Sequence, residues 1–232
     1  MTTQIATGML LLVLPVAYNV LFAVLARTFD YPDILRQPTG DVLRRFSDGG
    51  TKLVVTWWCF AMTAVLLAPA VLLLSNTLGD ANATVVALAT TFGVLAAAVQ
   101  FLGLIRWPLA VPYLARAAID PSADRATEAA VEVTFQTLNR YLGVAVGEHL
   151  GYLFTGLWTA VAGVALIQSD LLHPAFGVAG VALAPLFMLG AAEFVGPFEP
   201  DGWKVSAGLV PIAYIGWSLW LFAVGIGLLI AA

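Results

Sequence analysis

Long apolar runs alternate with short polar links along the whole chain. Spanning the hydrocarbon core of a bilayer takes about 20 apolar residues, each adding roughly 1.5 Å to a helix. Six runs reach this length, so the pattern predicts an all-α membrane protein whose single domain, residues 1–232, contains six transmembrane helices. The predicted spans are residues 5–26, 53–74, 85–105, 142–167, 176–195 and 205–230.

The composition supports this class. The chain is 61% hydrophobic and only 10% charged, whereas soluble domains average about 25% charged residues. An ordinary soluble domain is therefore excluded, the lipid bilayer is the predicted environment, and no nucleic-acid partner is expected. Cys59 is the only cysteine, which rules out an internal disulfide.

The positive charges are confined to three of the five connectors, residues 27–52, 106–141 and 196–204. The other two connectors contain no Lys or Arg. Because cytoplasmic loops of membrane proteins are rich in Lys and Arg, we expect the basic connectors inside the cell and both termini outside. The first run has no basic residue before it and is longer than the roughly 7–15 residues of a signal-peptide core, so we expect it to remain as a helix.

Two basic connectors are expected to form helices of their own. In the first, Val42, Leu43 and Phe46 fall on one side of a short helix, an arrangement typical of helices that lie at the headgroup level. In the second, a helical pattern from Ser122 runs into the fourth span, so we expect that helix to project into the cytoplasm. The cations assigned to the first, interfacial loop are Arg36, Arg44 and Arg45.

Polar side chains inside the predicted spans are few, and such groups are candidates for function because burying them in lipid is costly. Glu148 lies eight residues beyond Arg140, about 12 Å along a helix. Asn19 lies eight residues before the first basic connector, Gln100 lies six before the second, and Glu193 lies within a turn of the third. They therefore predict a polar layer, or a pocket open to the cytoplasm, in the inner half of the bundle. The candidate ligand-binding residues are Glu148, His149, Tyr152, Glu193, Gln100, Asn19, Trp57 and Arg106.

Two interpretations of these residues stay open. Tyr152 follows Glu148 by four residues, so its phenol could donate a hydrogen bond to the carboxylate within a binding site. Alternatively, the polar groups only hold neighbouring helices together through hydrogen bonds. The spacing of Gly143, Gly147 and Gly151 predicts close packing against another helix, which is either another span or a second copy in a homo-oligomer.

Glu148, His149 and Glu193 are acceptable ligands for a divalent ion. Adjacent helical residues diverge by about 100°, however, so Glu148 and His149 are poorly placed to share one ion, and no metal or other cofactor is predicted. The sequence contains no H-E-x-x-H, G-x-S-x-G, Walker or dinucleotide motif, which weakens the common enzyme interpretations.

Three functions follow from these candidates. The first is a non-enzymatic protein that binds a lipophilic or small polar ligand, or a membrane-protein partner, at its inner side. The second is a small-solute or proton-coupled transporter that uses Glu148 and Glu193. The third is an intramembrane enzyme, or a metal- or haem-binding protein, that uses Glu148 and His149.

Three stretches, residues 31–46, 106–108 and 147–155, carry a family resemblance. They resemble a family of bacterial multi-pass membrane proteins, the domain of unknown function 4386, over nearly the whole chain. The resemblance implies a six-span protein of the bacterial inner (plasma) membrane. It also implies that the first inside loop and the region of Glu148 and His149 matter, but it carries no activity.

Overall fold

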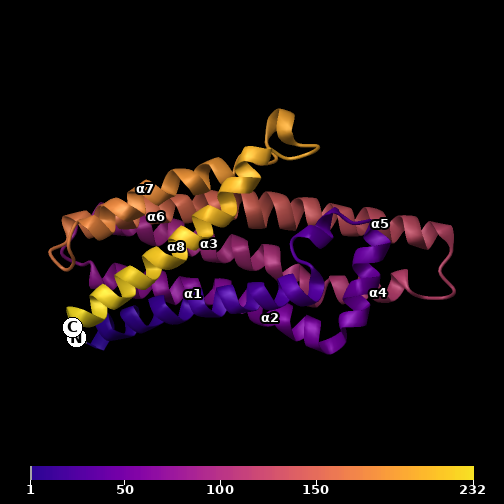
Figure 1. The fold of residues 1–232 in the computed structure, drawn as a ribbon, viewed down its shortest axis with the longest axis horizontal. Helices are drawn as coiled ribbons and strands as arrows, with labels where there is room; N and C mark the ends of the chain where they lie inside the picture. Colours follow the sequence, from indigo (N-terminus) through magenta and orange to yellow (C-terminus); the bar gives the residue numbers. More distant parts are fainter. Residues whose placement is uncertain (1) are drawn as a thin grey trace.

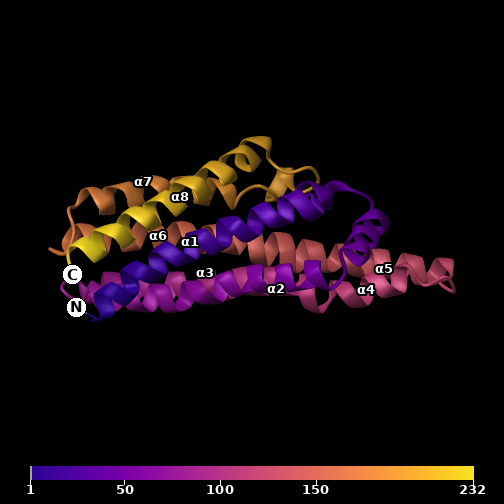
Figure 2. The same ribbon diagram turned by 60° about the horizontal axis from the view of Figure 1, so that its bottom comes forward.

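The computed structural model describes residues 2–232, which fold entirely into helices and the links between them (Figure 1). Most of these helices run side by side along the long axis of the molecule (Figure 2). The main helices are α1 (Thr2–Phe29), α2 (Thr39–Thr77), α3 (Ala83–Leu109), α4 (Val111–Ala118), α5 (Arg125–Leu138), α6 (Gly151–Gln168), α7 (Ala175–Gly190) and α8 (Lys204–Ile230). Short 3₁₀ turns occupy Asp33–Arg36 and Gly196–Phe198, and a π-helix occupies Asn139–Leu150.

Five helical stretches are long and apolar enough to cross a membrane. Their most apolar windows have mean hydropathies between 1.8 and 2.4. The protein is therefore a multi-pass membrane protein, and the predicted all-α class is confirmed. The five stretches are Thr2–Phe29, Thr39–Thr77, Ala83–Ala118, Arg125–Gln168 and Lys204–Ile230.

The sixth apolar helix, α7, is shorter than the predicted span 176–195. It has 16 residues and ends at Gly190, so it is about 24 Å long. The hydroxyl of Ser206, at the start of α8, lies 2.9 Å from the carbonyl oxygens of Leu189 and Gly190. It donates its proton to these two carbonyls, which have no partner within α7. Residues 191–195 consequently form turns rather than a last helical stretch.

The six apolar helices form a closed ring. Each packs against its neighbours in the order α1, α2, α3, α6, α7, α8, and α8 returns to contact α1. The two chain ends therefore lie together at one end of the bundle (Figure 1). There the Gln4 amide donates to the carbonyl of Leu228 at 3.0 Å and links α1 to α8.

The core is divided into two buried clusters along the bundle. The cluster near the chain ends includes Trp158, which lies among α6, α7 and α8 side chains. The cluster at the opposite end joins the end of α1 to α2, α4 and α5, and its centre is a stacked pair, Trp57 and Trp107, with ring centroids 4.6 Å apart. The polar residues described below lie between these two apolar clusters.

One helix of 44 residues runs from Arg125 to Gln168 and comprises α5, the π-helix and α6. Its length exceeds what a bilayer requires, as expected from the sequence, and its α5 end extends past the other helices (Figure 1). The π-helical winding of Asn139–Leu150 was not expected from the sequence. Most π-helices are single-turn bulges, and they are frequent at functional sites. A π-helix of 12 residues therefore makes this region a candidate for function.

The π-helix packs closely against α3. A Cβ added at Gly103 would lie 2.6 Å from the Cα of Gly147, so the two backbones are in direct contact at this crossing. One turn away on each side, Gly143 lies against the guanidinium of Arg106 and Gly151 lies against Gln100. The glycine ridge therefore contacts α3 of the same chain and fixes the position of the π-helix.

Candidate functional site

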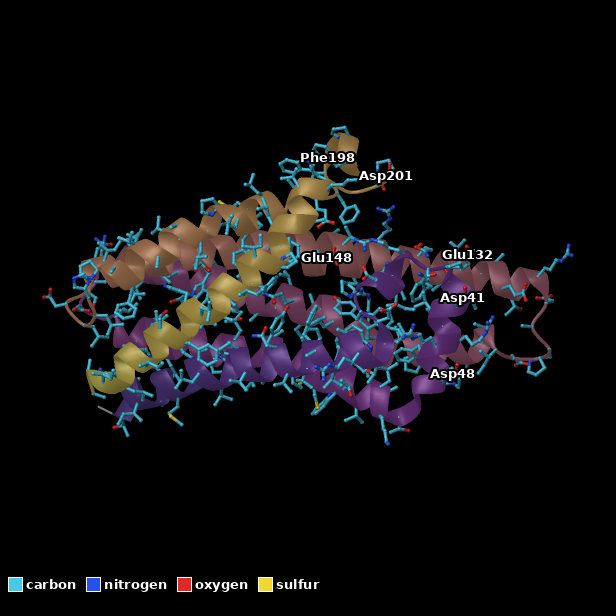
Figure 3. The ribbon with its side chains drawn as sticks, viewed as in Figure 1. Asp41, Asp48, Glu132, Glu148, Phe198 and Asp201 are labelled. Carbon is cyan, nitrogen blue, oxygen red and sulfur yellow. The ribbon has the colours of Figure 1, made fainter. Side chains whose placement is uncertain are left out.

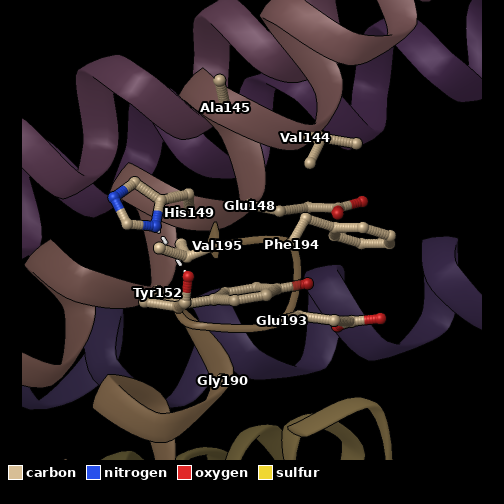
Figure 4. A pocket seen from close by; sticks show the side chains of 10 residues that line it. Val144, Ala145, Glu148, His149, Tyr152, Gly190, Glu193, Phe194 and Val195 are labelled. Atoms are coloured by element: carbon tan, nitrogen blue, oxygen red, sulfur yellow. Dashed lines mark hydrogen bonds between the residues drawn. The ribbon is translucent and has the colours of Figure 1, made fainter. Parts of the chain in front are cut away.

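A cavity of about 200 Å³ lies between the π-helix and the turn that follows α7 (Figure 4). Its polar lining comes from Glu148, His149 and Tyr152 on the long helix and from Glu193 in the turn. Its apolar walls include Val144, Ala145, Phe194 and Val195. Four of the predicted candidate residues therefore line one cavity.

The two carboxylates extend to the same side of the cavity. In Figure 4, the hydroxyl of Tyr152 lies between the carboxylates of Glu148 and Glu193. Within residues 2–232, no hydrogen bond joins Tyr152 to Glu148, and the Glu148 carboxylate has no hydrogen-bond partner. Its acceptor sites are therefore free to receive a donor that enters the cavity.

His149 has a different orientation from Glu148. Its Nδ1 lies 2.6 Å from the carbonyl oxygen of Ala191, and because a carbonyl only accepts, Nδ1 carries the proton. Figure 4 shows the imidazole turned away from the carboxylates. His149 thus fixes the end of α7 against the π-helix, and Glu148 faces the cavity.

The segment between α7 and α8 covers one side of the cavity. The backbone N–H of Trp203 donates to the carbonyl of Glu193 at 2.7 Å and closes the segment into a loop. Arg140 lies 3.3 Å from the carboxylate of Glu199 and 5.9 Å above the ring of Phe194. These contacts attach the loop to the long helix, so Phe194 is held as a wall of the cavity.

Glu193 lies in this loop, beyond the end of α7. Burial raises its pKa above the usual value for a carboxyl group, and the positive charge of Arg36 opposes that rise. Arg36, in the first connector, is therefore close enough to act electrostatically on the cavity, although its own ion pair is with Asp33 at 2.7 Å.

Arg106 is a buried cation next to the site, with only 7% of its surface exposed. Its guanidinium donates to the carbonyl of Gly103 and to the Asn139 side chain, and it lies 5.4 Å from the ring of Trp107. Among residues 2–232 no carboxylate lies within 4.0 Å of it. Arg106 does not line the cavity.

The pKa of Tyr31, in the first connector, is affected by its burial and by the charges of Glu148 and Arg106. Burial raises the pKa of its phenol to about 12, the negative charge of Glu148 adds to the rise, and the positive charge of Arg106 opposes it. Glu148 and Arg106 therefore act on the same buried phenol, one from the cavity side and one from α3. The first connector thus contributes Tyr31 as well as Arg36 to the surroundings of the cavity.

A second, smaller cavity of about 20 Å³ lies deeper in the bundle and has room for one water molecule. Tyr18, Thr63, Gln100 and Tyr214 provide its polar lining. The rings of Tyr152 and Tyr214 meet edge to face with centroids 5.9 Å apart, so aromatic side chains separate the two cavities.

The remaining predicted residues make contacts inside the protein. Gln100 donates to Thr155, and Asn19 donates to Ser218, each at 3.0 Å. Trp57 is fully buried against Trp107, and its indole N–H has no hydrogen-bond partner among the described residues. Arg44 and Arg45 pair at the surface with Asp41 and Asp30, at 3.5 and 3.8 Å.

Sequence reasoning missed several lining residues. Phe194 and Val195 fall at the end of the predicted span 176–195, and nothing in an apolar run distinguishes them as lining residues. Tyr18 and Tyr214 did carry a signal, because a tyrosine hydroxyl inside an apolar span needs a polar partner or a wet space. Within residues 2–232, no group of three or more His, Cys, Asp or Glu side chains is spaced to hold a metal ion.

A family model described as a domain of unknown function (DUF4386) matches residues 6–225 of this sequence. The chain belongs to this family. The resemblance predicted from three short stretches is thereby confirmed, and the match includes every residue that lines either cavity of this DUF4386 protein. No curated protein and no solved structure matches the chain.

Proposed function

We propose that this DUF4386 protein is a non-enzymatic membrane protein that binds a small ligand in the inner half of its helical bundle. The observation that carries the proposal is the cavity in which the free Glu148 carboxylate, Tyr152 and Glu193 meet. A concave, mostly apolar space with a few convergent polar groups is the usual form of a small-molecule site. Glu148 and Glu193 come from segments far apart in sequence, and the contacts of His149 and Arg140 hold those segments together.

Ligand retention tests this proposal. Native mass spectrometry of gently extracted protein should show a bound species, and Glu148→Gln should weaken its binding by roughly 10- to 100-fold, the equivalent of one hydrogen bond to a charged group. Glu132→Gln is the matched control, because Glu132 is exposed on α5 and remote from the cavity (Figure 3). Equal retention by the Glu148 and Glu132 variants would contradict the proposed site.

The proposed topology has six spans, with α7 as the fifth, and both termini outside a bacterial plasma membrane. The distribution of cations supports this orientation, and Figure 3 shows Asp41, Asp48 and Glu132 gathered at the end of the bundle opposite the chain ends. The connectors at that end are the proposed cytoplasmic connectors, and their short helices lie at the proposed membrane surface.

Cysteine labelling tests the orientation. In a Cys59→Ser background, a membrane-impermeant maleimide should label Gly79→Cys on intact cells and Ser122→Cys only after permeabilisation. Both positions are exposed, Gly79 in the link before α3 and Ser122 in the link before α5. The reverse pattern would refute the proposed orientation.

A transporter is the second candidate function, and the smaller cavity favours it. The ring of Tyr152, which lines the larger cavity, contacts the ring of Tyr214, which lines the smaller one, so the polar lining of one cavity is adjacent to that of the other. Flux in proteoliposomes that Glu148→Gln abolishes would favour transport over simple binding.

A further inference from the structure

We infer that the larger cavity binds a small organic cation, an amine or quaternary ammonium group attached to an apolar body. This inference rests on the proposed function, since it names the class of ligand for the same cavity. Its basis is the charge, the walls and the size of the space.

The charge of the lining favours a cation. Two carboxylates, Glu148 and Glu193, line the cavity, and no Lys or Arg lines it. Arg140 does not line the cavity; its guanidinium is paired with Glu199 and lies over the ring of Phe194. Arg106 does not line it either, and its guanidinium donates to Gly103 and Asn139. Arg36, the third cation near the cavity, is paired with Asp33. An anion in the cavity would therefore face two like charges, with the nearby cations already engaged by other groups, which costs free energy in a partly buried space.

The walls favour an organic cation over a metal ion. A metal ion needs several oxygen or nitrogen ligands around one point, whereas most of this lining is apolar. Tyr152 and Phe194 place two aromatic rings in the lining, and the face of an aromatic ring attracts an ammonium group. Val144 and Val195 provide surface for an apolar body beside it.

The size and position fit a small amphiphile. A space of about 200 Å³ suits a single-ring amine and is too small for a full lipid headgroup with its chains. Ala145 and Val195 are exposed at the edge of the cavity, so a ligand with an apolar body can enter past apolar side chains.

Three small probes of nearly equal shape test the charge preference: benzylamine, benzyl alcohol and benzoate. The protein is held in zwitterionic lipid nanodiscs at pH 8, and binding is measured by equilibrium dialysis with empty nanodiscs as the blank. We expect benzylamine to bind at least about tenfold more tightly than the alcohol, the equivalent of one charge-assisted hydrogen bond. Benzoate should bind weakest of the three.

Variants then connect the preference to the cavity. Glu193→Gln should lower the affinity for benzylamine about tenfold and leave that for benzyl alcohol unchanged. Phe194→Leu should lower the benzylamine affinity by about two- to fivefold through loss of the ring face. Glu132→Gln should change neither, and thermal unfolding of each variant in the nanodisc confirms that it is folded.

The outcomes separate this inference from the proposed function. If the alcohol or benzoate binds as tightly as benzylamine, and Glu148→Gln weakens that binding, the cavity is a ligand site but the cationic class is wrong. If benzylamine binds equally to the wild type and to Glu193→Gln, the inference is also overturned. If no probe binds and the extracted protein retains no species, both the inference and the proposed function fail.

Discussion

The contact between α3 and the π-helix gives the sharpest test of how the site is positioned. Gly103→Ala places a Cβ 2.6 Å from the Cα of Gly147 and 3.0 Å from the carbonyl oxygen of Leu142. Both neighbours are backbone atoms, so no side chain can rotate away. The helices must separate by at least 0.8 Å to move the Cβ from 2.6 Å to the 3.4 Å at which contacts become ordinary. Overpacking of this kind costs about 1–3 kcal/mol.

The free energy of unfolding, measured by titration with sodium dodecyl sulfate in mixed micelles, detects this cost. Gly208→Ala is the matched control, because Gly208 also lies in an apolar helix and a Cβ there meets no atom within 4 Å. We expect the control to be neutral or to gain up to about 1 kcal/mol from the better helix propensity of alanine. If Gly103→Ala is as stable as Gly208→Ala, the close helix crossing described here is wrong.

A structural consequence follows from the same variant. Arg106 lies one turn from Gly103 and reaches Asn139 across the contact at 3.0 Å. Separating the helices by 0.8 Å stretches this bond beyond hydrogen-bond distance unless the side chain moves. Gly103→Ala should therefore also increase amide hydrogen exchange in the π-helix, while Gly208→Ala should leave it unchanged.

Three further predictions concern single hydrogen bonds. His149→Ala should cost about 1–3 kcal/mol and speed hydrogen exchange in residues 191–203, because it leaves the Ala191 carbonyl without its donor; unchanged exchange there would contradict the assigned role. Thr159→Val keeps the volume of a buried side chain and should cost about 1–3 kcal/mol in the same unfolding assay, because it leaves the indole N–H of Trp217 without its acceptor; equal stability would show that this bond contributes nothing. The pKa of Asp80 is lowered by hydrogen bonds to its carboxylate, of which that from Ser169 has the largest effect. The ionised carboxylate therefore stabilises the fold at neutral pH, and this stabilisation is lost as the pH falls through the lowered pKa. Asp80→Asn should therefore flatten the acid side of the stability profile, by less than about 1 kcal/mol because the carboxylate is exposed, whereas an unaltered profile would exclude this role.

Much of the fold is encoded in features that act over one helix. Apolar runs long enough for a bilayer predict where helices lie. Prolines do not predict where the helices end, because Pro15, Pro69 and Pro185 lie inside α1, α2 and α7. The backbone of α2 is non-helical at Gly50, where φ is 55°, within a Gly-Gly pair near the end of the first connector. These features depend on neighbours within a few residues, so one sequence is enough to detect them.

The features that were missed depend on contacts between distant segments. The last residues of the predicted fifth span look apolar enough to be helical, yet Ser206 and His149 take up the carbonyls at the end of α7. The π-helical winding likewise has no known signature in the sequence of residues 139–150. For the site, the sequence identified Glu148, Tyr152 and Glu193 as polar groups at similar depth, but whether they face one another depends on how α7 ends.

The short α7 is the structural reason that a cavity exists at this place. Near the chain ends the ring is closed by direct helix contacts, such as that between Gly163 and Gly177, where each added Cβ would meet the other backbone within 2.6 Å. Toward the other end α7 stops at Gly190, while the neighbouring long helix continues through Glu148 and beyond. The carboxylate of Glu148 is therefore not covered by α7 and faces the loop that follows it. Extending α7 by one turn would fill this space, so the early end of α7 and the polar groups of the π-helix together determine where a ligand can bind.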